Sequence, residues 1–213
     1  MSKILYPAQL RYLEKFNKES DPLIEEMELF AEQNNIPILS KDSAKFLELL
    51  IKITKPKRVL ELGTAIAYSS IRIARNLKKK SIVHTIEKSQ DNISIAKENI
   101  AKFKLHEKIV IYEGNALEIM PTLQKKYDFI FLDADKTDYK RLFDYSIILL
   151  KKGGIIFIDN LLWHGYTASN KVPADRKIST KIIREFNELF ISQTNLKTTI
   201  LPIGDGIGIG VKE

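Results

Sequence analysis

The chain has 213 residues, a formal net charge of +7 at pH 7 and no cysteine. The absence of cysteine excludes thiol catalysis, cysteine-based metal sites and a disulfide framework. The sequence shows neither a signal-peptide core nor a run of roughly 18 apolar residues, so we expect a soluble, cytoplasmic protein that does not enter a membrane. No internal repeat or linker divides the chain, which predicts a single domain over residues 1–213.

Residues 1–54 are predicted to be helical. Three helices are expected, over Leu5–Glu19, from Asp21 onward and over Lys41–Ile53. The second begins at Asp21-Pro22, because aspartate caps a helix and proline suits its first turn. Leu23, Met27 and Phe30 share one face of this second helix.

From residue 55 onward, short apolar runs alternate with amphipathic stretches. Strands are expected at Arg58–Leu62, Ile82–Ile86, Ile109–Tyr112, Phe129–Leu132 and Ile155–Ile158, and helices near Ser69–Leu77, Asp91–Phe103 and Tyr139–Leu149. This alternation predicts an α/β fold with a mostly parallel sheet and helices on both faces. After a long helix at about Asp175–Phe190, the strands Lys197–Leu201 and Gly206–Val211 are expected to form an antiparallel hairpin at the sheet edge.

Ligands of such sheets bind at the carboxyl ends of the strands, so the residues after each strand are the candidates for a site. The first loop has only Gly63 of a G-x-G-x-x-G pattern, with Ala65 and Tyr68 at the other two places. This departure argues against a dinucleotide and is compatible with a nucleoside that lacks phosphates. Glu61, at the end of the first strand, can receive an ammonium group or lie exposed to water.

The next two strands end in further candidates for binding a nucleoside. Glu87 follows the second strand, where an acidic residue can accept hydrogen bonds from both ribose hydroxyls, or can simply start a helix. Asn115 follows the third strand and can hydrogen-bond an adenine edge, while Ala116 leaves room for the ring. A plain turn is the alternative for these two residues.

Two neighbouring strands deliver oxygen ligands to one edge of the sheet. Asp133 follows the fourth strand, and Asp159 and Asn160 follow the fifth. This all-oxygen set suits Mg²⁺, Mn²⁺ or Ca²⁺ and is poor for zinc, and without a cation its carboxylates would repel one another. A bound cation would stabilise the deprotonated form of a substrate hydroxyl. Lys136 is placed to act on the same hydroxyl as a base or as an electrostatic partner, unless it only pairs with surface aspartates.

The histidines carry less information. His84 lies within a strand and His106 within a turn, so both are interpreted as structural. His164 follows the candidate metal ligands and can line the mouth of a substrate site.

Taken together, these motifs resemble the cation-dependent class I O-methyltransferases, the group that contains catechol and caffeoyl-CoA O-methyltransferases. The segments that carry the resemblance are Glu61-Leu62-Gly63-Thr64-Ala65-Ile66-Ala67-Tyr68-Ser69, Glu87, Phe131-Leu132-Asp133-Ala134-Asp135-Lys136 and Ile158-Asp159-Asn160. The resemblance extends from about residue 37 to residue 211. It implies a Rossmann-like, seven-stranded methyltransferase fold, S-adenosylmethionine as methyl donor and a catalytic metal.

Site residues follow from this resemblance position by position. It implies that the methionine part of the donor is held by Glu61, Gly63 and Ser69, the ribose by Glu87, the adenine by Asn115 and Ala116, and the metal by Asp133, Asp159 and Asn160. Asp133 and Leu39 are also expected to touch the donor, with residues 36–39 as a lid, and Lys136 and Asp133 are the expected catalytic residues. The chain departs from the family at Ala67, where glycine is usual, and at Asn115, where aspartate is usual.

Within that family, the short helical N-terminal part and the Ile203-Gly204-Asp205-Gly206 ending resemble the bacterial enzymes that convert 5-hydroxyuridine at the tRNA wobble position to 5-methoxyuridine. O5 and O4 of that base form a vicinal pair that can chelate a metal, and the net positive charge suits tRNA phosphates. The resemblance therefore implies the anticodon region of tRNA as partner and a homodimer. Small catechol-like acceptors are the alternative, and an NAD-dependent oxidoreductase and a non-catalytic RNA-binding protein are less favoured.

Overall fold

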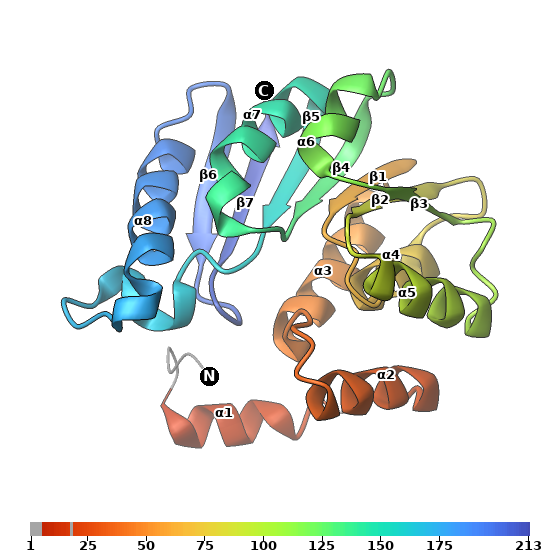
Figure 1. Ribbon diagram of the computed structural model, residues 1–213, viewed down its shortest axis with the longest axis horizontal. Coiled ribbons are helices and arrows are strands. Elements are labelled where there is room, and N and C mark those ends of the chain that lie inside the picture. Colours follow the sequence, from red (N-terminus) through yellow and green to blue (C-terminus); the bar gives the residue numbers. More distant parts are fainter. Residues whose placement is uncertain (1–5, 18) are drawn as a thin grey trace.

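The computed structural model describes residues 6–17 and 19–213, and its centre is one seven-stranded sheet (Figure 1). The strands are β1 (Arg58–Leu62), β2 (Ile82–Glu87), β3 (Ile109–Glu113), β4 (Tyr127–Leu132), β5 (Leu150–Ile158), β6 (Leu196–Leu201) and β7 (Ile207–Lys212). Their order in the sheet is β3-β2-β1-β4-β5-β7-β6. All neighbours are parallel except β7, which is antiparallel to both β5 and β6. The predicted sheet and hairpin are therefore confirmed, with β6 at the edge.

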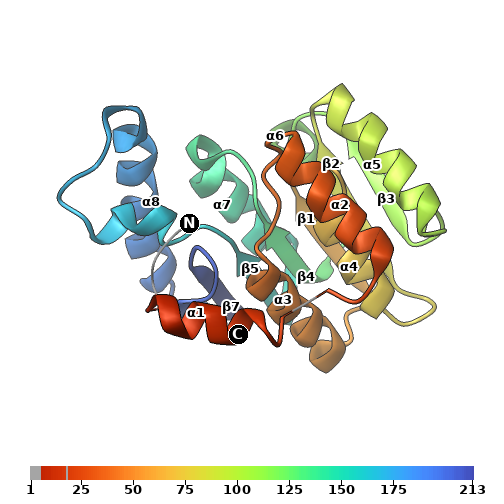
Figure 2. The ribbon, with the colours of Figure 1, turned by 90° about the horizontal axis from the view of Figure 1, so that it is seen from below.

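Helices cover both faces of this sheet. They are α1 (Pro7–Glu14), α2 (Pro22–Gln33), α3 (Lys41–Thr54), α4 (Tyr68–Asn76), α5 (Gln90–Lys102), α6 (Ala116–Ile119), α7 (Tyr139–Leu149) and α8 (Lys177–Ile191). Figure 2 shows α2, α4 and α5 on one side of the strands and α7 and α8 on the other. Among the described residues, no helix is both long and apolar enough to cross a membrane.

Alternation along β1 sends side chains into two separate cores. Val59 belongs to the core under α3 and α4, whereas Leu60 and Leu62 belong to the core under α7 and α8. Since successive side chains of a strand point to opposite faces, Glu61 lies on the same side as Val59. Its carboxylate is thereby directed at the start of α4.

The N-terminal helices differ from the predictions in phase and length. On α2 the buried side chains are Ile24, Met27 and Ala31, whereas Leu23 and Phe30 are each 38% exposed, so the predicted face is wrong at those two positions. The cap itself is as predicted, since the Asp21 side chain accepts from Leu23 N. The buried face is set by packing instead, because Ile24, Met27 and Ala31 stand three and four residues apart and join the same core. The predicted first helix is also too long: α1 ends at Glu14, and Leu5 lies outside the described residues.

The turn between β6 and β7 packs against two other segments. Gly204 has a φ of +58°, and a Cβ there would lie 2.2 Å from Ser43 Oγ, just inside α3. Gly206 has a φ of +89°, and a Cβ there would lie 2.6 Å from Leu162 N. Leu162 N in turn donates to Asp205 O at 2.8 Å, so the turn lies against the loop that follows β5.

Candidate active site

A cavity of about 630 Å³ lies at the carboxyl ends of the parallel strands. The loops after β1, β2 and β3 form one end of it, here called the donor half, and the loops after β4 and β5 form the other, here called the acidic half. All but two of the predicted site residues line it: Leu39, Gly63, Ser69, Glu87, Asn115, Ala116, Asp133, Lys136 and Asn160. The two that do not line it are Glu61 and Asp159, both of which are buried.

Gly63 is where the two halves meet. β1 and β4 are adjacent parallel strands whose chains turn to opposite faces, the arrangement that opens a crevice in a doubly wound sheet. Gly63 has a φ of +100°, and a Cβ there would lie only 2.0 Å from Asp133 O. Glycine is therefore required at this position by the neighbouring backbone as well as by φ.

Glu61 lies beneath the donor half and is fully buried. Ser69 Oγ and Thr85 Oγ1 donate to its carboxylate at 2.5 and 2.6 Å, and Ser70 Oγ donates as well. Burial raises the pKa of Glu61 to about 7, although the three hydroxyls favour the ionised form and oppose the shift. Of the two alternatives for Glu61, the carboxylate exposed to water is thus wrong. Ser69 is the residue that connects Glu61 with the cavity wall.

Glu87 and Asn115 lie where the loops after β2 and β3 face the cavity. One carboxylate oxygen of Glu87 accepts from Ala65 N at 2.9 Å, and the other accepts from Lys88 N and Ser89 N, also at 2.9 Å. Asn115 Oδ1 accepts from Leu117 N at 2.9 Å and so caps α6. The backbone fixes both side chains, which leaves the Asn115 amide group free to donate.

The acidic half brings Asp133, Asp159 and Asn160 together around Lys136. Lys136 Nζ contacts Asn160 Oδ1 at 2.6 Å, Asp133 Oδ1 at 3.3 Å and Ala134 O at 3.2 Å, and it also bonds the Tyr139 hydroxyl. The Lys136 side chain is only 12% exposed. Lys136 therefore stands beside the candidate metal ligands, as predicted. The alternative interpretation, a surface lysine that only pairs with aspartates, does not agree with the structure.

Asp159 carries the clearest sign that this half is incomplete. Its Oδ1 is buried and makes no hydrogen bond. Burial, together with the charge of nearby Asp133, raises the pKa of Asp159 to about 8. A divalent cation would satisfy such an oxygen and would keep both carboxylates ionised. The donors present, two carboxylates and an amide, fit Mg²⁺; among the described residues no group of three or more His, Cys, Asp or Glu forms a larger metal cluster.

Asp205 is not among the predicted site residues, but the structure places it at the acidic half, where it contacts His164. Asp205 Oδ1 accepts from His164 N at 2.6 Å, while the Asn160 amide donates to Asp159 Oδ2 at 3.2 Å. Burial raises the pKa of Asp205. Asp205 was missed because it lies in the turn before β7, and only the insertion of β7 beside β5 brings that turn to the site.

The loop after β5 has an unusual backbone. Asn160, Trp163 and His164 have φ values of 63°, 47° and 56°, in the left-handed region that disfavours residues with a Cβ. Trp163 and His164 line the cavity, as expected for His164. His84 instead bonds the Tyr127 hydroxyl through Nδ1 at 2.8 Å, in line with its interpretation as structural.

This sheet and its cavity define a Rossmann-like methyltransferase fold, and comparison with known proteins agrees. The chain belongs to the O-methyltransferase family, whose model matches residues 14–213. It is 32% identical to a catechol O-methyltransferase of Niastella koreensis, over 92% of this chain and 87% of that one. It is 31% identical to caffeoyl-CoA O-methyltransferase 2 of Petunia hybrida, over 90% and 84%.

A solved structure extends the likeness to the donor. The O-methyltransferase of Bacillus cereus in complex with S-adenosylhomocysteine (SAH) is 30% identical, with a TM-score of 0.82 over 95% of this chain and 96% of that one. Together with the family match, this makes the chain an O-methyltransferase that uses S-adenosylmethionine.

Proposed function

We propose that the chain transfers the methyl group of S-adenosylmethionine to one oxygen of an acceptor that presents two neighbouring oxygens, with a divalent cation, Mg²⁺ in the first place, held by Asp133, Asp159 and Asn160. The observation that carries this proposal is the buried, unpaired Oδ1 of Asp159 beside Asp133 and Asn160. When bound there, the cation would lower the pKa of the acceptor hydroxyl and fix its position.

The donor half supports a placement for S-adenosylmethionine. Glu87, with both oxygens already oriented by backbone N–H groups, is set to accept from the ribose hydroxyls, and Asn115 with Ala116 to hold the adenine. Ser69, backed by Glu61, would meet the methionine end. In this placement the sulfonium methyl points toward the acidic half, since Asp133 follows directly on the strand beside Gly63.

Lys136 acts on the acceptor as an electrostatic partner. Its Nζ contacts three fixed oxygens and the Tyr139 hydroxyl, so it holds a positive charge beside the reacting hydroxyl. That charge stabilises the developing oxyanion, and the partly buried position strengthens the effect. Trp163, whose ring centroid lies 5.8 Å from Lys136 Nζ, walls the same space and helps to exclude water.

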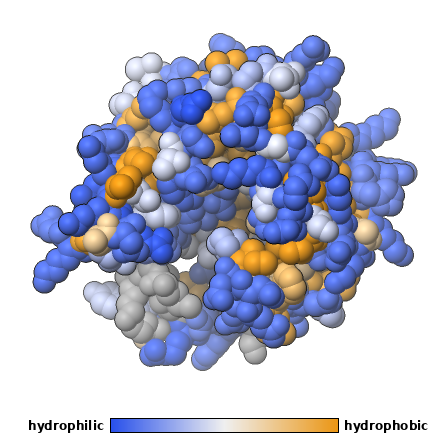
Figure 3. Space-filling model, viewed as in Figure 1, coloured by the Kyte–Doolittle hydropathy of each residue, from blue (hydrophilic) through white to orange (hydrophobic). Residues whose placement is uncertain are grey.

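The acceptor is proposed to be a small catechol-like molecule. The sequence favoured tRNA 5-hydroxyuridine, but the relatives named above are catechol and caffeoyl-CoA O-methyltransferases, which supports the alternative acceptor better. A tRNA acceptor stays a second candidate because the net charge is +7 and exposed cations, Arg176 and Lys88 among them, line the cavity. Figure 3 shows that hydrophilic residues dominate this face of the molecule, around a hollow near its centre.

The test is a methylation assay with labelled S-adenosylmethionine. Catechol and tRNA that lacks 5-methoxyuridine are offered separately, with Mg²⁺ or with EDTA, and the products are analysed by mass spectrometry. Label on catechol that disappears with EDTA supports the proposal. Label appearing only as 5-methoxyuridine favours the second candidate, and Mg²⁺-independent transfer to either acceptor would contradict the metal site.

The homodimer also stays a proposal. Tyr12 and Phe16 on and just after α1 are 60% and 64% exposed, which suits an interface with a second copy. Light scattering after gel filtration tests it, and a monomeric mass at micromolar concentration would reject it.

A further inference from the structure

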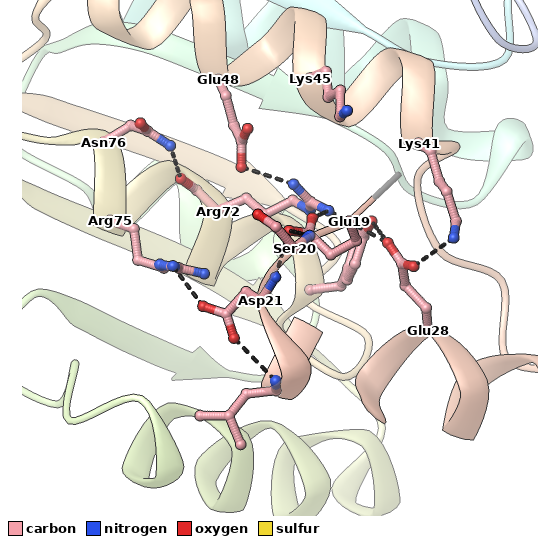
Figure 4. Close-up of polar contacts among 12 residues, drawn as sticks. Glu19, Ser20, Asp21, Glu28, Lys41, Lys45, Glu48, Arg72, Arg75 and Asn76 are labelled. Carbon is pink, nitrogen blue, oxygen red and sulfur yellow. Dashed lines mark hydrogen bonds and ion pairs between the residues drawn. The ribbon is translucent and has the colours of Figure 1, made fainter. Parts of the chain in front are cut away.

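Arg72 of α4 is a buried cation that the reaction itself does not use. Only 3% of the residue is exposed, and its guanidinium bonds three carboxylates. Arg72 Nη1 contacts Glu48 at 2.8 Å, while Nη2 contacts Glu28 at 3.3 Å and also bonds Glu19. Figure 4 shows these carboxylates converging on Arg72 from separate elements.

The three carboxylates come from three parts of the N-terminal region. Glu19 precedes α2, Glu28 lies within α2 and Glu48 lies within α3. Two more contacts strengthen the connection through Glu28, because Lys41 Nζ pairs with its Oε2 at 2.7 Å and the Tyr68 hydroxyl donates to its Oε1 at 2.6 Å. Arg72 therefore joins α4, the helix that starts in the donor half, to the two helices that flank residues 34–40.

Residues 37–39 form part of the wall of the donor half. Ile38, Leu39 and Tyr68 line the active-site cavity and also a second cavity of about 500 Å³ on the α2 side. The wall between the two cavities is thus only a few side chains thick. Its position depends on where α2 and α3 stand, and both helices are tied to Arg72.

A buried ion cluster is poor evidence for stability, because the cost of desolvating the charges offsets much of their attraction. Its better-attested use is to fix one geometry. Arg72 suits this use, since a planar guanidinium can hold several carboxylates in fixed directions at once. Its ring contact with Tyr68, 4.8 Å from guanidinium carbon to ring centroid, extends the same constraint to the cavity wall.

We propose that Arg72 is a positioning residue that latches α2 and residues 37–39 over the donor half and so sets how long the donor stays bound. The inference rests on the proposed placement of the donor in that half. When the ion pairs of Arg72 break, the wall formed by residues 37–39 moves toward the second cavity and the donor can leave. Arg72 itself touches neither reactant.

The experiment measures SAH binding and release by stopped-flow fluorescence, without acceptor. Glu28→Gln keeps the shape of the side chain and removes its charge. Glu26→Gln is the matched control, because Glu26 lies on the same helix and pairs with Lys102 at 2.8 Å on the surface. We expect the SAH dissociation rate to rise roughly tenfold in Glu28→Gln with little change in the association rate, and to stay within about twofold in Glu26→Gln.

Arg72→Met should raise the dissociation rate further, and Glu28→Gln keeps the test decisive if that variant does not fold. Hydrogen exchange gives a second readout: the amides of residues 36–40 should exchange faster in Glu28→Gln, whereas those of β1 should not. Equal SAH dissociation rates in the wild type, Glu28→Gln and Glu26→Gln would overturn the proposed role of Arg72. A wild-type chain that binds no SAH would instead overturn the donor placement.

Discussion

The two halves of the cavity differ in how completely the chain satisfies its own polar groups. In the donor half, Glu61 accepts from three hydroxyls and Glu87 from three backbone amides. In the acidic half, Asp159 Oδ1, Asp205 Oδ2 and Trp163 Nε1 are buried without a hydrogen-bond partner. This difference is what the proposed function expects, because a bound cation and an acceptor would supply the partners that the polar atoms of the acidic half lack.

The largest effect is expected from Asp159→Asn, which should impair the acidic half and leave the donor half intact. Methyl transfer should fall roughly a thousandfold, because the variant removes a charged ligand from the site that stabilises the developing oxyanion. SAH affinity, measured by calorimetry, should change by less than about twofold, since Asp159 does not line the cavity. Equal losses of transfer and of SAH binding would show that the two halves are not independent.

Gly63→Ala tests the junction of the halves. The new Cβ would overlap Asp133 O, so we expect the free energy of unfolding to fall by about 3 kcal/mol or more and SAH binding to be lost. Gly153→Ala is the control, because Gly153 has a φ of +71° but no atom within 4 Å of an added Cβ. Urea denaturation should show a loss of only about 1 kcal/mol there, from the backbone alone; similar losses in both would mean that crowding at Gly63 is unimportant.

Glu61→Gln tests the buried charge of the donor half. The pKa of Glu61 is raised from 4.5 to about 7 by burial, so the folded state holds this proton more tightly than the unfolded state does. Its contribution to stability is then fully present below pH 4.5 and is lost as the pH rises through 7. Glutamine does not titrate, so the stability of the wild type relative to Glu61→Gln should fall by about 2 to 3 kcal/mol between pH 4.5 and pH 8. A pH-independent difference in denaturation would contradict this.

The smallest effect is expected from Ala67→Gly. Ala67 is buried with a φ of 65°, where an alanine is strained by about 1 kcal/mol or more. Glycine relieves that strain but adds freedom to the unfolded chain, so the net gain should be about 0.5 kcal/mol. Thermal unfolding with and without SAH measures this change in stability. A loss of stability would show that packing of the alanine methyl group outweighs the backbone strain.

Much of the sheet could be predicted from apolar periodicity. The bounds of β1 and α7 were predicted to the residue, because a short buried strand and an amphipathic helix each leave a clear pattern. The phase of α2 was not, since Leu23 and Phe30 are as apolar as the residues that are buried. The apolar pattern of a helix does not by itself show which side of the helix packs against its neighbours.

The site residues that could be predicted from the sequence are those that lie just after a strand. Asp133 directly follows β4 and Asn160 is the second residue after β5, and both line the cavity where parallel strands end. Asp205 and Arg72 depend instead on contacts between distant parts of the chain. Arg72 meets Glu19, which lies 53 residues away in sequence, and no local pattern predicts that meeting.

The position of β7 has a consequence for the order in which the protein takes shape during synthesis. β1, β2 and β3, which carry the donor half, are made first, and β7 is made last of all the strands although it lies between β5 and β6. Until it arrives, β5 exposes the edge from Ile155 to Ile158 that β7 later covers. The nascent chain can therefore complete its donor half early, while the strand that leads into Asp159 stays open to wrong pairing until β7 has been made.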